Sequence, residues 1–96
     1  MPAYVIVNVH IQEPVEYAEY KKLTPASIAA FEGEFIVRGG AAEILEGEPK
    51  IGRVVVIKFP DSGRARAWWN SSEYATAKAI RQRTATTEMI LVEGVS

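Results

Sequence analysis

The stretch Phe35-Ile-Val-Arg-Gly-Gly-Ala-Ala-Glu-Ile-Leu45 governs how the strands of this 96-residue chain are arranged. An apolar run ends at Arg38, two glycines follow, and a second apolar run begins. Because glycine takes positive φ without steric cost, the pair predicts a bend, bulge or reversal between two strand segments, Phe35–Arg38 and Ala42–Leu45. A bend in one long second strand, carrying Ala42–Leu45 outward, fits the order of the neighbouring elements best.

Strands are predicted on both sides of this stretch. They are rich in β-branched residues, with apolar side chains at alternate positions or on both faces, and they cover Ala3–Ile11, Arg53–Phe59 and Thr87–Glu93. In the first strand every odd position is apolar, whereas the even positions turn polar at Asn8 and His10. One face of the sheet is therefore a core face, and the other is apolar at one end and polar at the other.

Two helical regions separate the strands. The first begins at Pro14 and stops at Gly33. Pro25 lies inside it and predicts a kink or two abutting helices, because proline lacks a donor and disfavours helical backbone at the preceding residue. The second covers Arg64–Arg83 and is interrupted at Asn70-Ser71-Ser72-Glu73.

The order strand, helix, two strands, helix, strand predicts an α+β domain with the ferredoxin-like βαββαβ fold. No linker or composition shift divides the chain, so one domain over residues 1–96 is expected. Two helical regions cover only one face of a four-stranded antiparallel sheet. Since two of the strands are apolar on both faces, the uncovered face exposes an apolar area on the order of several hundred Å², the scale of an interface. A homodimer packed sheet on sheet is the simplest cover.

Composition and charge exclude several classes of binding partner and of chemistry. The net charge of −1, with basic residues scattered along the chain, predicts no nucleic-acid or anionic-membrane partner. The absence of cysteine excludes disulfides, thiol catalysis and Cys-ligated metal. The chain opens directly into a strand-like run and has no apolar stretch near the ~20 residues of a membrane span, so a cytoplasmic location is expected.

A set of short motifs in a fixed order covers nearly the whole chain: Tyr4-Val-Ile-Val-Asn8, Tyr17-x-x-Tyr20, Pro25-Ala-Ser27, Phe35-x-Val-Arg-Gly-Gly40, Leu45-Glu-Gly47, Phe59-Pro60, Ala67-Trp68, Asn70-Ser-x-x-Tyr74 and Leu91-Val-Glu-Gly94. The combination resembles the DUF1330 family, a domain of unknown function in the dimeric α/β-barrel superfamily. The resemblance implies a βαββαβ monomer that pairs its sheet with the sheet of a second monomer. It also implies a ligand cleft between the sheet and the helices. Relatives include cofactor-independent monooxygenases and isomerases, but a shared fold assigns no activity.

His10 is the only histidine, and an unperturbed imidazole titrates near neutrality. It shares a strand face with Asn8, so both could face one cavity, with His10 as general base, substrate contact or haem ligand. The alternative is a half-exposed histidine at a strand end without a partner. One histidine with no converging acids does not make a zinc or non-haem iron site, so no metal and no cofactor are expected.

Arg38 stands in an otherwise apolar strand and is a candidate for binding a carboxylate, enolate or phenolate through its planar fork. The alternative is a structural ion pair with Glu43 or another acid, at the sheet rim or across the dimer. Tyr20 and Tyr74 are candidates for ligand contact. Trp68 and Trp69 cannot both face one side of their helix, so one of them is expected to pack on the sheet. Trp68 is the candidate for the ligand site.

The sequence supports two hypotheses of function. The first is a homodimeric domain that binds a small, partly apolar, anionic molecule in a cleft between sheet and helices. The second is a cofactor-independent isomerase or monooxygenase with His10 as proton acceptor, which requires His10 and Arg38 to converge on one closed cavity. A pure interaction module is favoured if Trp68 and Tyr74 fill the cleft.

Overall fold

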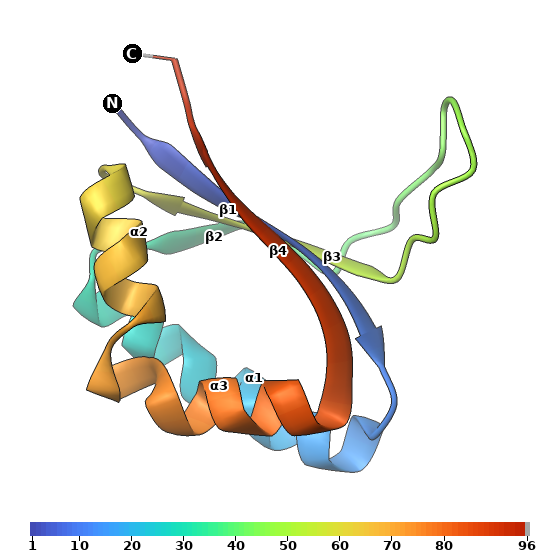
Figure 1. Cartoon of the computed structure of the whole chain (residues 1–96), viewed down its shortest axis with the longest axis horizontal. Coiled ribbons are helices and arrows are strands. Elements are labelled where there is room, and N and C mark those ends of the chain that lie inside the picture. The colour runs from blue at the N-terminus through green and yellow to red at the C-terminus, as the bar shows by residue number, and fades with distance from the viewer. Residues whose placement is uncertain (96) are drawn as a thin grey trace.

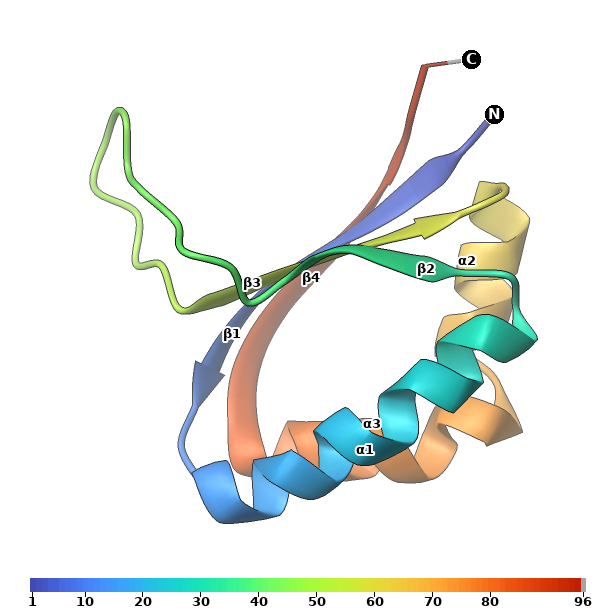
Figure 2. The same ribbon diagram turned by 180° about the vertical axis from the view of Figure 1, so that it is seen from behind.

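The computed structural model describes residues 1–95. Its elements are β1 (Ala3–Ile11), α1 (Pro14–Ala30), β2 (Glu34–Arg38), β3 (Arg53–Phe59), α2 (Ser62–Trp69), α3 (Ser72–Thr84) and β4 (Ala85–Glu93). The strands form one four-stranded sheet in the order β2-β3-β1-β4, and each neighbouring pair is antiparallel. All the helices of the described residues lie on one side of this sheet (Figures 1 and 2). The predicted α+β, ferredoxin-like βαββαβ fold is confirmed.

The core lies between the helices and one face of the sheet. The odd residues of β1 from Ala3 to Val9 are buried there, and the β1–β3 register pairs Val5 with Ile57 and Val7 with Val55. Because side chains alternate along a strand, a slip of one residue would turn all of these to the other face. The register is therefore set by the apolar pattern that the sequence displays.

Helix α1 runs as one helix through Pro25, so the expected alternative of two abutting helices is wrong. Proline has no N–H to donate to the carbonyl four residues earlier, which belongs to Lys21. The guanidinium of Arg38 donates to this carbonyl instead, with an Nη2–O distance of 3.1 Å. One residue earlier the Thr24 hydroxyl donates to the Tyr20 carbonyl at 2.6 Å. Side chains thus satisfy the backbone groups around the proline, and the helix does not break.

Side chains at the helix ends confirm the predicted break between α2 and α3. Asp61 caps α2 by accepting a hydrogen bond from the Arg64 amide at 2.7 Å. Ser71 caps α3 by accepting from the Tyr74 amide at 3.1 Å. Such caps satisfy donors that a helix start leaves free and are worth about 1 kcal/mol each. The Ser71 cap lies in the turn between the two helices, which borders the cleft described below.

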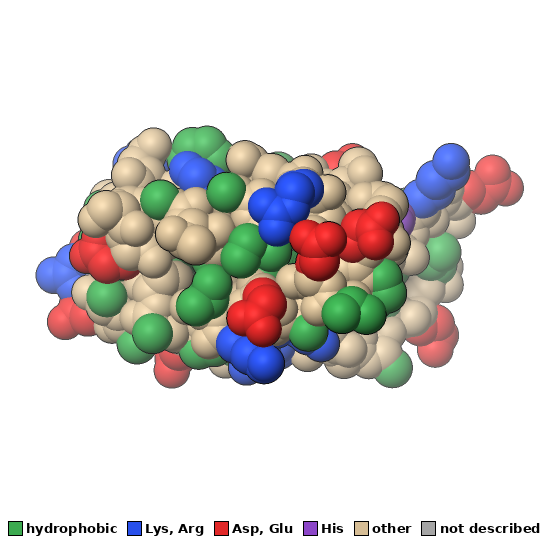
Figure 3. All heavy atoms as spheres, turned by 90° about the horizontal axis from the view of Figure 1, so that it is seen from below, with side chains coloured by type: hydrophobic (Ala, Val, Ile, Leu, Met, Phe, Trp, Pro, Cys, Tyr) green, Lys and Arg blue, Asp and Glu red, His purple; other side chains and the backbone are tan. Residues whose placement is uncertain are grey.

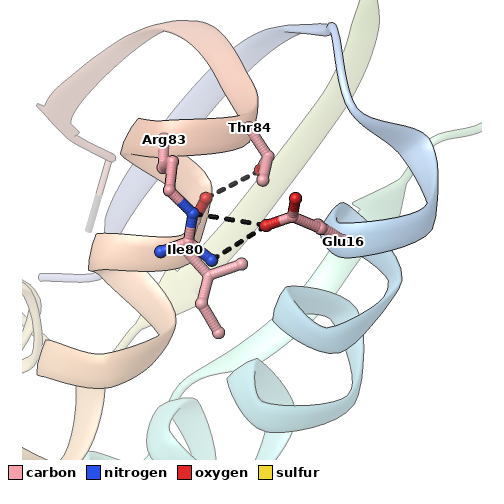
Figure 4. A network of polar contacts seen from close by, with 4 residues as sticks. All are labelled: Glu16, Ile80, Arg83 and Thr84. Atoms are coloured by element: carbon pink, nitrogen blue, oxygen red, sulfur yellow. Dashed lines mark hydrogen bonds and ion pairs between the residues drawn. The ribbon is translucent and has the colours of Figure 1, made fainter.

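The two long helices are also tied together at their surface, as Figure 4 shows. Arg83 near the end of α3 donates through two nitrogens to Glu16 in the first turn of α1, at 3.0 and 3.3 Å. Beside it, the Thr84 hydroxyl donates to the Ile80 carbonyl at 2.7 Å. Both charges are largely exposed, so the pair contributes at most about 1 kcal/mol. The helical face of the molecule shows mixed acidic and basic side chains (Figure 3).

The strand expected at Ala42–Leu45 is absent from the described chain, which is a correction to the sequence analysis. Strand β2 ends at Arg38, after a register shift between Phe35 and Val37. Gly39 then takes φ +74°, and the chain leaves the sheet. Residues 40–51, called the arm below, project from one end of the sheet beyond the rest of the chain (Figures 1 and 2). Because no strand among residues 1–95 runs beside the arm, it has no ladder to join.

The outer face of the sheet, away from the helices, carries exposed apolar side chains. They come from the first, second and last strands: Ile6, Val37, Ile90 and Val92. The sequence predicted such an uncovered apolar face, because two helical regions cover only one side of a four-stranded sheet. Separately, no helix among the described residues has the length and apolar character needed to cross a membrane.

Candidate functional site

A cleft of about 410 Å³ opens between the helices and the core face of β1 and β4. Its volume lies in the range of small-molecule sites. The lining residues come from all four elements around the α2–α3 turn: Val5, Ala65, Arg66, Trp69, Asn70, Arg81, Gln82, Thr87, Met89, Ile90 and Leu91. Apolar groups thus form most of the wall, while a few polar groups are placed to orient a ligand.

Arg81 is the charged group most deeply set in this wall. Only 5% of the residue is exposed, and its Nε donates to the Tyr74 hydroxyl at 3.2 Å. The ion pairs among residues 1–95 join Lys22 to Glu19, Arg64 to Glu32 and Arg83 to Glu16, and none involves Arg81. A buried cation is costly unless a counter-charge or several acceptors satisfy it. The guanidinium of Arg81 is therefore suited to receive an anionic group that enters the cleft.

Thr87 supplies a second polar group in the same wall. Its hydroxyl is buried and has no hydrogen-bond partner among the described residues. A buried polar atom left without a partner costs about 1–3 kcal/mol. A ligand atom that donates to or accepts from the Thr87 hydroxyl would recover part of that cost.

A chain of buried tyrosines lies behind Arg81. The hydroxyls of Tyr20 and Tyr74 are 2.8 Å apart, and Tyr74 in turn contacts Arg81. Burial raises the pKa of Tyr20 above its ordinary value, and the neighbouring Tyr74 raises it further. Burial raises the pKa of Tyr17 as well. Tyr17 and Tyr20 therefore stay neutral near pH 7, and the Tyr74 hydroxyl fixes one edge of the guanidinium.

Trp68 and Tyr74, which the sequence analysis placed in a ligand site, lie in the core with no exposed surface. Their rings are tilted against each other with centroids 4.1 Å apart, and the Trp68 indole donates to Ser27 at 3.1 Å. Trp69 is the tryptophan that lines the cleft. Tyr20 is buried too, behind Arg81. Since the cleft stays open beside these rings, the condition set for a pure interaction module is not met.

Asn8 and His10 lie on the outer face of the sheet, opposite the cleft. The Asn8 amide donates to the Lys50 carbonyl at 2.9 Å and accepts from the Gly52 amide at 2.8 Å, so it anchors the arm. Its nitrogen also lies 3.3 Å from a Glu88 carboxylate oxygen and 3.5 Å from His10 Nε2. These contacts occupy the amide with the chain's own groups.

Arg38 lies on the helix side of β2, in a recess of about 20 Å³ beside α1, which is the volume of roughly one water molecule. It donates to the Lys21 carbonyl and packs over the Phe35 ring, 4.4 Å from the ring centroid. Arg38 and His10 are therefore on opposite faces of the sheet. The enzyme hypothesis requires these two residues to converge on one closed cavity, and within this chain they do not.

Arg81 is the residue that sequence reasoning missed. It belongs to a buried stripe on α3, formed with Tyr74, Ala77 and Thr84. The spacing of three, four and three residues is that of one helix face. An arginine inside an otherwise buried stripe is a signal that the sequence contains, and it could have identified the site.

No metal centre is indicated by the described residues. They contain no group of three or more His, Cys, Asp or Glu side chains placed to hold a metal ion. The candidate site is thus made of one buried guanidinium, a few neutral polar groups and apolar walls.

Comparison with solved structures shows the same fold in several proteins. A protein of unknown function from Rhodopseudomonas palustris superposes with a TM-score of 0.80 at 16% identity, covering 99% of this chain and 83% of that chain. A dimeric ferredoxin-like protein of unknown function from Jannaschia sp. CCS1 gives a TM-score of 0.75 at 13% identity, covering 98% and 100%. SnoaB, a cofactor-independent oxygenase from Streptomyces nogalater, gives 0.68 at 16% identity, covering 99% and 94%.

These identities show a shared fold and nothing finer. The comparison with curated proteins gave no match. The model of the domain of unknown function DUF1330, in contrast, matches residues 2–95, nearly the whole chain. The chain therefore belongs to the DUF1330 family.

Proposed function

We propose that this chain acts as a homodimer that binds a small, partly apolar, anionic molecule in the cleft between α2, α3 and β4. The observation that carries the proposal is Arg81, a buried guanidinium in the cleft wall without an acidic partner among residues 1–95. The ligand class follows the sequence expectation, while the anchoring arginine is Arg81 in place of Arg38.

The chemistry of the wall specifies the ligand further. A guanidinium binds a carboxylate or enolate through parallel hydrogen bonds, and one edge of Arg81 is already held by Tyr74. Trp69, Met89 and Leu91 offer flat and flexible apolar surface beside it. An aromatic or enolic carboxylate therefore matches the site better than a small, fully hydrated anion such as phosphate.

The outer face supports the homodimer. Ile6, Val37, Ile90 and Val92 expose apolar surface that only an additional molecule can cover. The structural neighbour from Jannaschia sp. CCS1 is described as dimeric, with the same ferredoxin-like fold. Two copies packed through these faces would leave both clefts accessible, because the clefts lie on the helix side.

The alternative, a cofactor-independent enzyme with His10 as general base, has less support. The fold is shared with the oxygenase SnoaB, but His10 lies outside the cleft lining, on the outer face of the sheet. The residues that line the cleft include no Asp, Glu, His or Lys side chain. A reaction that needs such a base has no candidate there, so binding is the better supported function.

The experiment is a thermal-shift screen of aromatic and enolic carboxylates, each compared with its neutral amide. Wild type, Arg81→Met and the control Arg38→Ala are tested in parallel. A ligand at 100 times its Kd stabilises the fold by about 2.7 kcal/mol, which raises Tm by roughly 10 °C or more in a domain this small. Carboxylates should stabilise wild type and Arg38→Ala, and lose this effect in Arg81→Met. Carboxylates that stabilise Arg81→Met as much as wild type would show that Arg81 does not anchor the ligand.

A further inference from the structure

The cleft contains a second arginine, which the proposed function leaves unused. Arg66 of α2 lines the cleft together with Arg81 of α3. Arg81 is buried, whereas Arg66 is exposed and therefore lies at the mouth of the cleft. The ion pairs among residues 1–95 involve neither guanidinium, and the cleft lining includes no Asp or Glu. The cleft thus offers an incoming molecule two positive charges at different depths.

Arg81 marks the end of the cleft at which β4 begins. Helix α3 passes directly into β4 at Ala85, so Arg81, four residues earlier, lies beside the first residues of the strand (Figure 1). From there the β4 part of the lining runs from Thr87 to Leu91. Four residue steps along a strand cover about 13 Å. The cleft therefore extends along the strand well beyond the space that one carboxylate occupies.

Arg66 marks the opposite end of the cleft. The Ser62 hydroxyl donates to the Glu93 carboxylate at 3.2 Å, which ties the start of α2 to the end of β4. The Nη1 of Arg66 lies 3.5 Å from the same hydroxyl, so its guanidinium points toward the end of β4. Glu93 accepts from Ser62 and forms no ion pair with Arg66 within residues 1–95. The guanidinium of Arg66 therefore lacks a strong acceptor, which an anion in the cleft would supply.

The wall between the two arginines is mostly apolar, with Ala65, Trp69, Met89 and Leu91 in the lining. We propose that the ligand of this cleft is an elongated dicarboxylate. One carboxylate binds Arg81, an apolar or aromatic body lies along the wall, and the second carboxylate binds Arg66 at the mouth. This inference rests on the proposed function, because it specifies the ligand class of the same cleft.

The two arginines make different contributions to affinity. Arg81 is buried and little screened by salt, so it anchors any carboxylate that reaches it. Arg66 is exposed, and an exposed ion pair strengthens an interaction by up to about fivefold and weakens in salt. A cationic ligand would meet like charge at both ends of the cleft and is disfavoured. Charge therefore selects the ligand at both ends.

Isothermal titration calorimetry measures the contribution of the second carboxylate. Two dicarboxylates are titrated, a rigid para-linked biphenyl dicarboxylate and the flexible, linear sebacate, each against its half-amide, which has the same length and one charge fewer. Wild type should bind at least one dicarboxylate about three- to fivefold more tightly than its half-amide. The difference should shrink in half-molar salt, because Arg66 is exposed. Phthalate, whose two carboxylates are adjacent, is too short to reach Arg66 and should gain nothing over its half-amide.

Two variants on α2 assign the effect to one side chain. Arg66→Gln should remove the difference between dicarboxylate and half-amide, and leave the affinity for the half-amide nearly unchanged. The matched control is Arg64→Gln, because Arg64 is an exposed arginine of the same helix that pairs with Glu32 and lies outside the cleft lining. This control should keep the wild-type difference.

The outcomes separate this inference from the proposed function. Half-amides that bind as tightly as both dicarboxylates, or a difference that survives in Arg66→Gln, would overturn the inference and leave the carboxylate site at Arg81 standing. If neither half-amides nor dicarboxylates bind, or if Arg81→Met binds them as wild type does, the proposed function fails and the inference fails with it.

Discussion

At the scale of single residues, Arg81 combines features that a purely structural side chain does not need. It is buried, it donates to the Tyr74 hydroxyl, and no acid among the described residues pairs with it. Replacing a buried charge by an apolar residue of similar size is often neutral or stabilising. Sites built for ligands commonly give up stability in this way.

The first prediction follows from that cost. Arg81→Met should unfold at the same or a higher urea concentration than wild type, with a gain of about 0–2 kcal/mol, although it no longer binds the carboxylate ligand. Urea unfolding with and without ligand measures both effects on one sample. A loss of several kcal/mol in the absence of ligand would instead assign Arg81 a role in holding the fold.

The second prediction concerns the buried tyrosines. Burial raises the pKa of Tyr20 and of Tyr17 in the folded chain, whereas in the unfolded chain both titrate near 10. Below pH 10 both tyrosines are protonated in the folded and in the unfolded chain, so the stability that they contribute is fully present. Above pH 10 the unfolded state releases protons first, and the free energy of unfolding falls by up to ~1.4 kcal/mol per pH unit for each group.

Denaturant unfolding between pH 8 and 11 measures this slope. Tyr20→Phe cannot ionise at that position, so its decline above pH 10 should be shallower than that of wild type. Equal slopes in the two proteins would show that Tyr20 does not carry the dependence. Tyr4→Phe, at a partly exposed tyrosine, is the matched control and should keep the wild-type slope.

At the scale of elements, the third prediction concerns how α1 stays continuous through Pro25. Pro25 has no N–H to donate to the Lys21 carbonyl. This carbonyl accepts a hydrogen bond from Arg38 instead. Arg38→Ala should therefore cost about 0.5–1.5 kcal/mol. In a Pro25→Ala background the helix regains its own donor, so the same substitution should cost less.

A double-mutant cycle by urea unfolding gives the coupling directly. Coupling of at least about 0.5 kcal/mol between Arg38 and Pro25 supports the account. Additive effects would mean that the contact contributes nothing, which is common for exposed pairs.

The sequence predicted most elements correctly because their signals are local. Alternating apolar residues in 3–11 and 53–59, and caps at Asp61 and Ser71, act within a few residues. It failed at Ala42–Leu45, since a strand needs a neighbour and periodicity does not say whether one exists in the same chain. It also chose Trp68 over Trp69 for the site, although Ala65 and Trp68, three residues apart, are both buried and share one face of α2.

The family resemblance implied a cleft between sheet and helices, and the structure contains one. The arginine that the sequence analysis assigned to it was Arg38, whereas the buried arginine in its wall is Arg81. Which arginine enters the cleft depends on the rotation of α3 and on the sheet face of residue 38, which a bulge near Ile36 alters. Such a bulge changes which side chains point inward, and composition does not reveal it.

At the scale of the whole molecule, the fourth prediction concerns dimerisation. Ile6 lies on the outer face of β1, a central strand of the sheet. Ile6→Asp places a charge in the proposed interface and should turn the dimer into a monomer at micromolar concentration, as measured by sedimentation equilibrium. Val15→Asp, at an exposed apolar residue on α1, is the control and should remain dimeric. Wild type sedimenting as a monomer would refute the interface outright.

The central claim, that an anionic molecule binds in the cleft through Arg81, is tested most directly by NMR of the ¹⁵N-labelled chain. The two tryptophan indole N–H signals report on different places: Trp69 lines the cleft, whereas Trp68 is buried and bonded to Ser27. Titration with the best carboxylate from the screen should shift the Trp69 indole, the Thr87 amide and the Arg81 Nε–H, and leave the Trp68 indole nearly unchanged. Shifts centred on Arg38 and Lys21, or on Asn8 and His10, with a silent Trp69 indole, would contradict it.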